Sequence, residues 1–431
     1  MKIIDSDLAR LSLPKGLVVP MTSLTGATLA NSLVGFVVNV VAAKNLGAEG
    51  FGMFSLAFSI ATMAGAIGDF GFNLTVIRLF NRYQKEPEKQ TMVLGAALGF
   101  KVLLFAFLAV TCLPVGVFLA LSLGVGSTGS KLFAIALITG GFLFFWTYFQ
   151  SYLQSYRSFG QLAGYILGYA GLRVVCLGVA YEFFPENPLA WILATYTIPV
   201  AVIILGGLVP KGTKVMRIAF KQLGVSLEIL REMLNYSKWV ALSAIAYVAM
   251  PYLVRFILAM CASVAEVGIF SAGMTFTMAF TTLNTAMRAI IFPQVTAFEG
   301  QEQVSRYLAR LKIIAPYYAV AAMLGVIVLG FLQWFALGEE YRAALPVFLV
   351  TGGAFAIVLF LGLGTMLVHT MMKPEIDAWT NVGRLCLMII LALLLVPSYG
   401  ALGGAIAYVV PLLIGEIWMF LYVKQRSSRC L

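Results

Sequence analysis

Twelve long apolar runs leave this chain few choices of fold. Each has about 20 residues or more, the length that an α-helix needs to cross the hydrocarbon core of a bilayer. Hydrophobic residues make up 61% of the chain and charged residues 11%, whereas soluble domains have about 45–50% and about 25%. The runs lack the short alternating pattern of barrel strands, so we predict an all-α polytopic membrane protein with about 12 transmembrane helices. They cover residues 18–42, 52–78, 92–122, 132–155, 162–182, 189–209, 239–260, 268–292, 313–336, 344–368, 378–397 and 402–423.

Basic residues alternate between the two sides of the predicted membrane. With the N-terminus counted as gap zero, the odd-numbered gaps hold only Lys44, Lys131 and Arg342, whereas the even-numbered gaps and the termini hold twenty. Loops rich in Lys and Arg stay in the cytoplasm, so we predict that both termini are cytoplasmic. The net charge of +11 is then mostly a topological signal, and it requires no nucleic acid as a partner.

Similar segments recur at about half the chain length. Gly52 and Gly268 open the second and eighth runs in related surroundings, and Arg173 with Arg384 and Pro199 with Pro411 keep nearly the same offset. Six runs separate the equivalents, which gives both halves the same orientation. We therefore predict two six-helix lobes related by a pseudo-twofold axis along the membrane normal, with a substrate cleft between them.

We place the N-terminal lobe at 1–209, a cytoplasmic amphipathic linker at 210–238 and the C-terminal lobe at 239–431. The linker is predicted to be a helix at the membrane surface. Its apolar positions at helical spacing are Leu223, Leu227, Leu230 and Leu234.

Six of the 29 basic residues lie within the predicted membrane helices, whereas only two acids lie well inside them. A charge at mid-bilayer costs at least about 2.5–3.5 kcal/mol, so the surplus cations need a wet cavity or an anionic ligand. Guanidinium groups bind phosphate oxygens in pairs. We interpret the six as candidate ligands of a pyrophosphate or similar anionic head, whose apolar tail would remain in lipid between the lobes: Arg78, Lys101, Arg173, Arg255, Arg288 and Arg384.

Other interpretations of these charges stay open. Arg78 and Arg288 lie near helix ends, where long side chains can extend to the interface. Asp69 and Glu416 are either counter-ions or ion-coupling sites. As a counter-ion, Asp69 would pair with a neighbouring arginine.

No metal site, cofactor or catalytic centre is expected. His369 is the only histidine, and no cluster of metal-ligating residues surrounds it. The five cysteines are too far apart for a metal knuckle. The predicted outer gaps are too short for a catalytic domain, so we expect a protein that is not an enzyme.

Several segments resemble the oligosaccharide flippases of the polysaccharide-biosynthesis (Wzx-type) family. The usual sequence pattern of that family is an apolar helix, then A-R-x-L-G, an acid, an aromatic-Gly pair and a second apolar helix. The matching residues here are Ala43-Lys44-Asn45-Leu46-Gly47-Ala48-Glu49-Gly50-Phe51-Gly52, Gly68-Asp69-Phe70-Gly71-Phe72, Glu266-Val267-Gly268-Ile269-Phe270-Ser271 and Phe292-Pro293. The chain departs from the pattern at Lys44, where the family often has Arg, at Ser237-Lys238-Trp239, where it often has Pro, and at Val254, where an acid is common.

The resemblance implies membership of the multidrug/oligosaccharidyl-lipid/polysaccharide exporter superfamily. Such proteins move polyprenyl-pyrophosphate-linked oligosaccharides, the repeat units of O-antigen, capsule or exopolysaccharide, across the bacterial inner membrane by alternating access. The implied partners are the lipid-linked oligosaccharide, membrane lipid, and the glycan polymerase and chain-length machinery.

Three alternatives remain: a cation-coupled multidrug antiporter, a peptidoglycan-precursor flippase of the same superfamily and, less favoured, a membrane glycan polymerase. The basic surplus disfavours cationic drugs. The first run, 18–42, also lacks the acid that the multidrug branch often has there.

Overall fold

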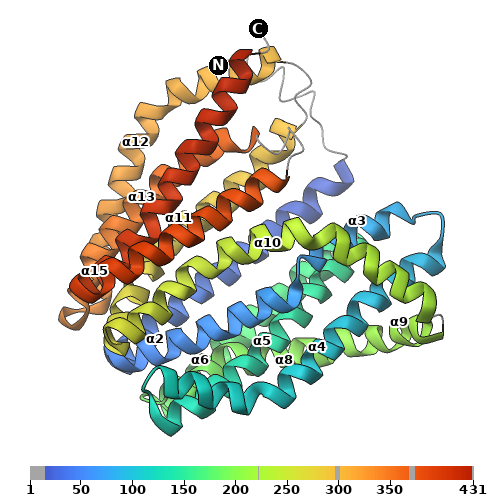
Figure 1. The fold of residues 1–431 in the computed structure, drawn as a ribbon, viewed down its shortest axis with the longest axis horizontal. Coiled ribbons are helices and arrows are strands. Elements are labelled where there is room, and N and C mark those ends of the chain that lie inside the picture. Colours follow the sequence, from blue (N-terminus) through green and yellow to red (C-terminus); the bar gives the residue numbers. More distant parts are fainter. Residues whose placement is uncertain (1–14, 222, 297–300, 368–373, 430–431) are drawn as a thin grey trace.

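The computed structural model describes residues 15–221, 223–296, 301–367 and 374–429, and these residues form helices with short connections and no strand (Figure 1). Three short segments complete the helices: the π-helical η1 (Leu193–Thr197) and η2 (Ile204–Leu208), and the 3-10 turn η3 (Glu339–Tyr341). The helices are α2 (Lys15–Asp69), α3 (Phe72–Arg82), α4 (Pro87–Ser122), α5 (Gly126–Ser155), α6 (Phe159–Phe183), α7 (Pro188–Ile192), α8 (Ile198–Ile203), α9 (Val209–Lys221), α10 (Leu223–Cys261), α11 (Val264–Thr296), α12 (Gln301–Leu337), α13 (Ala344–Thr365) and α15 (Pro374–Arg429).

Two of the helices reverse direction at a glycine. Gly47 in α2 has φ 66° and ψ 177°, and Gly400 in α15 has φ 52° and ψ −132°, conformations that glycine adopts without the steric cost of a Cβ. Figure 1 shows each helix turning back on itself, so we call the parts before and after the glycine its first and second limbs.

Ten segments of the described residues are long and apolar enough to cross a membrane. Two of them, of 61 and 48 residues, contain the glycine reversals. At 1.5 Å per residue each is long enough for two crossings of a core about 30 Å thick. The prediction of twelve crossings agrees with these lengths and stays a prediction.

The two halves of the chain share a core at one end only. Gly47 and Gly400 lie at this end, which we call the hairpin end, where buried residues of both halves, such as Phe51 and Phe270, join one hydrophobic cluster. Away from it the clusters separate, one from Ala27 to Met233 and a smaller one from Val295 to Leu367. In Figure 1 the early and late helices correspondingly diverge from the hairpin end at the lower left.

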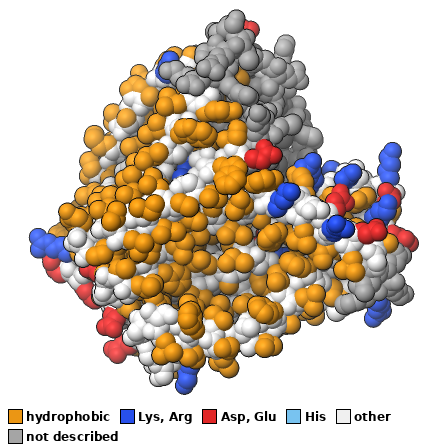
Figure 2. All heavy atoms as spheres, viewed as in Figure 1, with side chains coloured by type: hydrophobic (Ala, Val, Ile, Leu, Met, Phe, Trp, Pro, Cys, Tyr) orange, Lys and Arg blue, Asp and Glu red, His pale blue; other side chains and the backbone are white. Residues whose placement is uncertain are grey.

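The surface is apolar over a broad face (Figure 2). Orange side chains cover this face, while acidic and basic side chains gather toward its edges. Large hydrophobic residues are widely exposed, among them Val110 at 80% and Phe335 at 78%. Contiguous apolar surface of this extent requires an apolar surrounding, and the chain is a multi-pass membrane protein.

The predicted linker covers parts of two helices. Its residues 210–221 belong to α9, and from Leu223 onward it is continuous with the following apolar run as α10. The face that α10 buries here contains Ser226, Ile229 and Met233, while Leu227 is 55% exposed. Since Leu230 and Leu234 pack partly buried against the core of the N-terminal half, the leucine spacing identified the helix and part of the face that packs there.

Candidate functional site

The deepest cation of the N-terminal half is fully paired. Lys101 of α4 is 0% exposed, and its Nζ donates to Oδ1 of Asp69 at the end of α2 over 2.8 Å. Thr147 of α5 donates to the same oxygen at 2.8 Å. The partner of Asp69 is therefore a lysine, whereas we had expected an arginine. Lys101 thereby ties α4 to α2 through a buried ion pair.

Arg173 of α6 has no carboxylate partner among the described residues. Its Nε donates to the carbonyl oxygen of Thr195 at 2.9 Å and its Nη1 to Oδ1 of Asn31 at 3.4 Å. Thr195 lies in η1, and a π-helical turn leaves carbonyl groups free of the regular ladder. The Nη2 of Arg173 is buried without a hydrogen-bond partner in the described structure, a costly state for a charged group.

Arg255 of α10 also lacks an ion pair in the described ranges, and it joins the two halves. Its Nε donates to Ser271 Oγ at 3.0 Å and its Nη1 to Ser59 Oγ at 3.1 Å. Ser59 lies in α2 and Ser271 in α11, so the guanidinium sits at the boundary between the halves.

Aromatic rings connect the two arginines. Arg173 lies 4.7 Å from the ring centre of Tyr196 and Arg255 lies 5.3 Å from that of Tyr252. Between these tyrosines stands Phe58, with ring centres 4.6 Å from Tyr196 and 6.2 Å from Tyr252. We call these five residues the arginine–aromatic centre.

Arg384 lines a polar cavity of about 360 Å³ in the C-terminal half, which we call the C-half cavity. Its Nη2 pairs with Oε1 of Glu416 at 3.1 Å, and its Nη1 donates to Oδ1 of Asn381 at 3.1 Å. Asn381 in turn donates to Ser243 of α10 at 2.9 Å, and Ser243 donates to Asp377. The lining residues come from α10, α11, α13 and α15 and are Ser243, Ala244, Tyr247, Asn284, Thr285, Val358, Thr365, Asp377, Asn381, Arg384, Glu416 and Met419.

The other two predicted site residues lie elsewhere. Arg78 is exposed on α3, where it donates to the Tyr236 hydroxyl and stacks 4.2 Å from that ring's centre. Arg288 lies in α11, and its side chain lies outside the described residues, as does His369. The predicted set of six is thus not one cluster.

Sequence reasoning identified Arg384 and Glu416 of the C-half cavity but missed other polar residues that line it, among them Asp377, Asn381 and Ser243. Asp377, Asn381 and Arg384 follow one another at intervals of four and three, which places them on one face of α15. That spacing was visible in the sequence. Ser243, which completes the network from α10, offered no such signal.

Basic charge exceeds acidic charge in the interior. Of the described side chains more than nine-tenths buried, the cations Lys101, Arg173, Arg255 and Arg384 outnumber the carboxylates of Asp69 and Glu416. Since each carboxylate has its own partner, the excess resides on the arginine–aromatic centre.

The halves touch closely at the hairpin end through the two glycines of the sequence repeat. A Cβ on Gly52 would overlap the carbonyl oxygen of Val264, and one on Gly268 would overlap that of Ala48. The two contacts are equivalent, because Gly52 and Gly268 are 216 residues apart and so are Ala48 and Val264. The repeat found in the sequence is therefore also a symmetric contact between α2 and α11.

Solved structures of several membrane transport proteins have a similar fold. An inward-facing multidrug resistance MATE family transporter of the MOP superfamily superposes with a TM-score of 0.70 at 18% identity, covering 93% of this chain and 95% of that one. The lipid II flippase MurJ, in an inward closed conformation, gives 0.72 at 13% identity over 93% and 87%. A MOP superfamily transporter from Pyrococcus furiosus gives 0.63 at 16% identity over 95% of both chains.

The sequence itself defines the family. Residues 20–299 match the family described as "Polysaccharide biosynthesis protein", well over half of the chain, and the chain belongs to that family. No curated protein sequence shows significant similarity to it.

Proposed function

We propose that the protein is a flippase for polyprenyl-pyrophosphate-linked oligosaccharide in the bacterial inner membrane. The observation that carries this proposal is the arginine–aromatic centre, where two buried guanidinium groups lack a carboxylate in the described structure. Guanidinium forks bind phosphate oxygens in pairs, and family membership connects the chain to polysaccharide synthesis.

The distribution of basic residues supports an orientation with both termini in the cytoplasm, so that the hairpin end faces outward. The substrate then enters from the side where the cores are separate. Its pyrophosphate reaches Arg173 and Arg255, and the hydroxyl and amide groups of the C-half cavity accommodate the sugars. Alternate opening of the two halves at the cytoplasmic end and at the hairpin end moves the substrate across, a process without bond chemistry.

Flipping of a polyprenyl-pyrophosphate oligosaccharide in proteoliposomes tests the proposal. Arg173→Gln and Arg255→Gln each remove charge-assisted hydrogen bonds, and we expect rates to fall by about 10- to 100-fold. Arg82→Gln is the matched control, because Arg82 is a 66% exposed surface residue paired with Glu232. Wild-type rates in both buried-arginine variants, at equal amounts of folded protein, would contradict the proposal.

A second candidate, cation-coupled export, is favoured by one observation. Asp377 and Glu416 line the C-half cavity together with Arg384, so the charged side chains of its lining carry one more acid than base. A proton or sodium gradient should then drive transport, and Asp377→Asn should abolish the dependence of transport on that gradient. Export of a cationic dye under such a gradient, with no flipping of any lipid-linked glycan, would establish this function over the first.

A further inference from the structure

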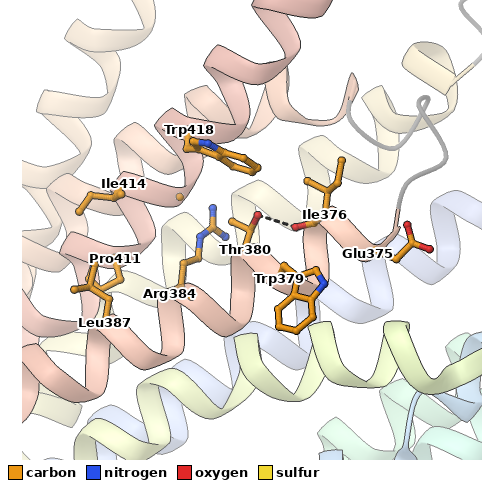
Figure 3. Close-up of a pocket in the computed structure, with 11 residues that line it drawn as sticks. Glu375, Ile376, Trp379, Thr380, Arg384, Leu387, Pro411, Ile414 and Trp418 are labelled. Atoms are coloured by element: carbon orange, nitrogen blue, oxygen red, sulfur yellow. Dashed lines mark hydrogen bonds between the residues drawn. The ribbon is translucent and has the colours of Figure 1, made fainter.

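A groove of about 540 Å³ lies between the two limbs of α15 (Figure 3). Its walls are mostly apolar, with Leu387 and Pro411 at one end and Trp379 and Trp418 facing across it, and Glu375 lies at the opposite end from Leu387. The tryptophans are 62% and 47% exposed, so the groove, which we call the α15 groove, is open to the surrounding lipid. A membrane-facing groove with such walls suits a hydrocarbon chain.

The α15 groove has a cation at its floor. Figure 3 shows Arg384 between Trp418 and Trp379, and the same residue lines the C-half cavity on the other side. The two Nη atoms of Arg384 bind Glu416 and Asn381, but its Nε is buried with no hydrogen-bond partner in the described structure. Arg384 is only 5% exposed. One donor of a buried guanidinium is therefore unsatisfied where an apolar groove meets a polar cavity.

A second groove shows what an apolar groove looks like without this feature. It has about 520 Å³, lies between α12 and α13, and is lined by residues such as Ala319, Met323 and Gly353. None of its lining residues is charged. A groove that only accommodates acyl chains requires no buried donor, so the unsatisfied Nε of Arg384, rather than its charge, which Glu416 compensates, indicates an occupant with a hydrogen-bond-accepting group such as a phosphate attached to its hydrocarbon.

The distance of Arg384 from the start of α15 favours a transported lipid over a resident phospholipid. Arg384 lies ten residues after Pro374, the start of α15, or about 15 Å along the helix. Phospholipid phosphates stay at the membrane surface, outside the hydrocarbon core. A phosphate reaches this depth when it is being carried across the bilayer, as the head of a flipped lipid is.

We propose that the α15 groove binds the polyprenyl chain of the substrate, with its phosphate at Arg384 and its glycan in the C-half cavity. This inference rests on the proposed function and names the subsite for the lipid part. It places the tail within the C-terminal half, between the limbs of α15, whereas we had expected the tail to leave between the lobes. Arg384 then receives the phosphate before the arginine–aromatic centre does.

Photolabelling tests the groove without requiring transport. The probe is a polyprenyl phosphate without glycan that carries a diazirine in its first isoprene units, added to the full-length protein in phosphatidylethanolamine vesicles. We expect labelled peptides from 376–387 and 411–418, and little label on the residues that line the α12–α13 groove. A polyprenol probe without phosphate should lose this preference.

Two glycines provide matched variants. A Cβ on Gly383 in the α15 groove, or on Gly353 in the α12–α13 groove, meets no atom within 4 Å, so Gly383→Leu and Gly353→Leu each extend a side chain from an uncrowded position that lines one groove. Gly383→Leu should reduce labelling and flipping by about tenfold, the change expected when two methylenes lose their contact. Gly353→Leu should leave both unchanged.

Several results would overturn the proposal. Excess phosphatidylglycerol that removes the label would show a groove for bulk phospholipid. Wild-type labelling and flipping by Gly383→Leu would show that the α15 groove is not the binding site, while leaving the flippase function intact. Specific labelling of a wild-type protein that flips no lipid-linked glycan would instead refute the proposed function and preserve a polyprenyl-phosphate site.

Discussion

The buried basic residues of this chain differ in what surrounds them. Lys101 and Arg384 have carboxylate partners, whereas Arg173 and Arg255 are held by carbonyl, amide, hydroxyl and aromatic groups. The sequence revealed that these charges were inside the membrane, because each interrupts an apolar run. It could not reveal the pairing of Asp69 with Lys101, 32 residues later, because this pairing depends on how the two helices that carry them are rotated.

Removal of Lys101 should act on stability rather than on transport alone. Lys101→Met leaves Asp69 buried with only the Thr147 hydroxyl, and breaking a buried pair in this way costs about 3–5 kcal/mol. The double variant Lys101→Met with Asp69→Asn removes the uncompensated charge and should recover most of the loss. Thermal unfolding in detergent measures both. A single variant with wild-type stability but slow flipping would instead show that Lys101 serves the substrate.

Gly415 should control the position of Arg384. A Cβ at this position would collide with the guanidinium of Arg384, whereas one at Gly383 meets nothing within 4 Å. We expect Gly415→Ala to cost about 1–3 kcal/mol through overpacking and to abolish the phosphate preference of the photolabelling probe. Gly383→Ala is the control and should keep both properties. Retained phosphate preference in Gly415→Ala would show that the guanidinium need not lie where the structure places it.

At the scale of elements, the sequence predicted well what depends on local composition. The apolar runs became helices, and glycines occupy the reversals at Gly47 and Gly400 because both need positive φ. Sequence patterns predicted less well which face of a helix is buried, because this depends on the element against which the helix packs. Two of the leucines at 223–234 pack partly on the core of the N-terminal half, but the residues that α10 buries most deeply there are Ile229 and Met233.

The α2–α11 contact should tolerate no side chain at its two glycines. Gly52→Ala and Gly268→Ala place a methyl group against a backbone carbonyl that cannot move without moving its helix. Each should separate the halves at the hairpin end and reduce flipping by about tenfold or more, an effect of about 1.4 kcal/mol. Gly171→Ala in α6 is the control, since a Cβ there has no neighbour within 4 Å. Spin labels on α2 and α11 would measure the separation, and an unchanged distance would contradict this account.

At the scale of the whole molecule, the halves share a core at the hairpin end and have separate cores at the other, so the structure is closed at the hairpin end. The sequence repeat predicted two related halves, and Gly52 with Gly268 now connects that repeat to a contact between them. The C-half cavity was beyond prediction, because it combines α10, α11, α13 and α15, and only coordinates show which of their faces meet.

Two glutamates at the hairpin end allow the contact between the halves to be tested with the same substitution at two sites. Glu340 accepts from the backbone nitrogen of Ala48 at 2.7 Å and thereby joins the two halves, whereas Glu266 accepts from that of Ala401 at 2.6 Å within the C-terminal half. Both carboxylates cap the start of a helix limb, and each is worth about 1 kcal/mol. Replacement by alanine should therefore reduce stability about equally in the two variants.

Only Glu340→Ala, however, should change the balance between conformations. Loss of a contact that exists in one conformation shifts the population by its own free energy, here about fivefold toward opening at the hairpin end. A cysteine at Thr62 of α2, in a background without the five native cysteines, reports this opening through its rate of modification by an impermeant maleimide. The rate should rise about fivefold in Glu340→Ala and stay at the parent value in Glu266→Ala. Equal rates in the two variants would mean that the hairpin end does not open during transport, because the capping contact between the halves would then carry no conformational energy.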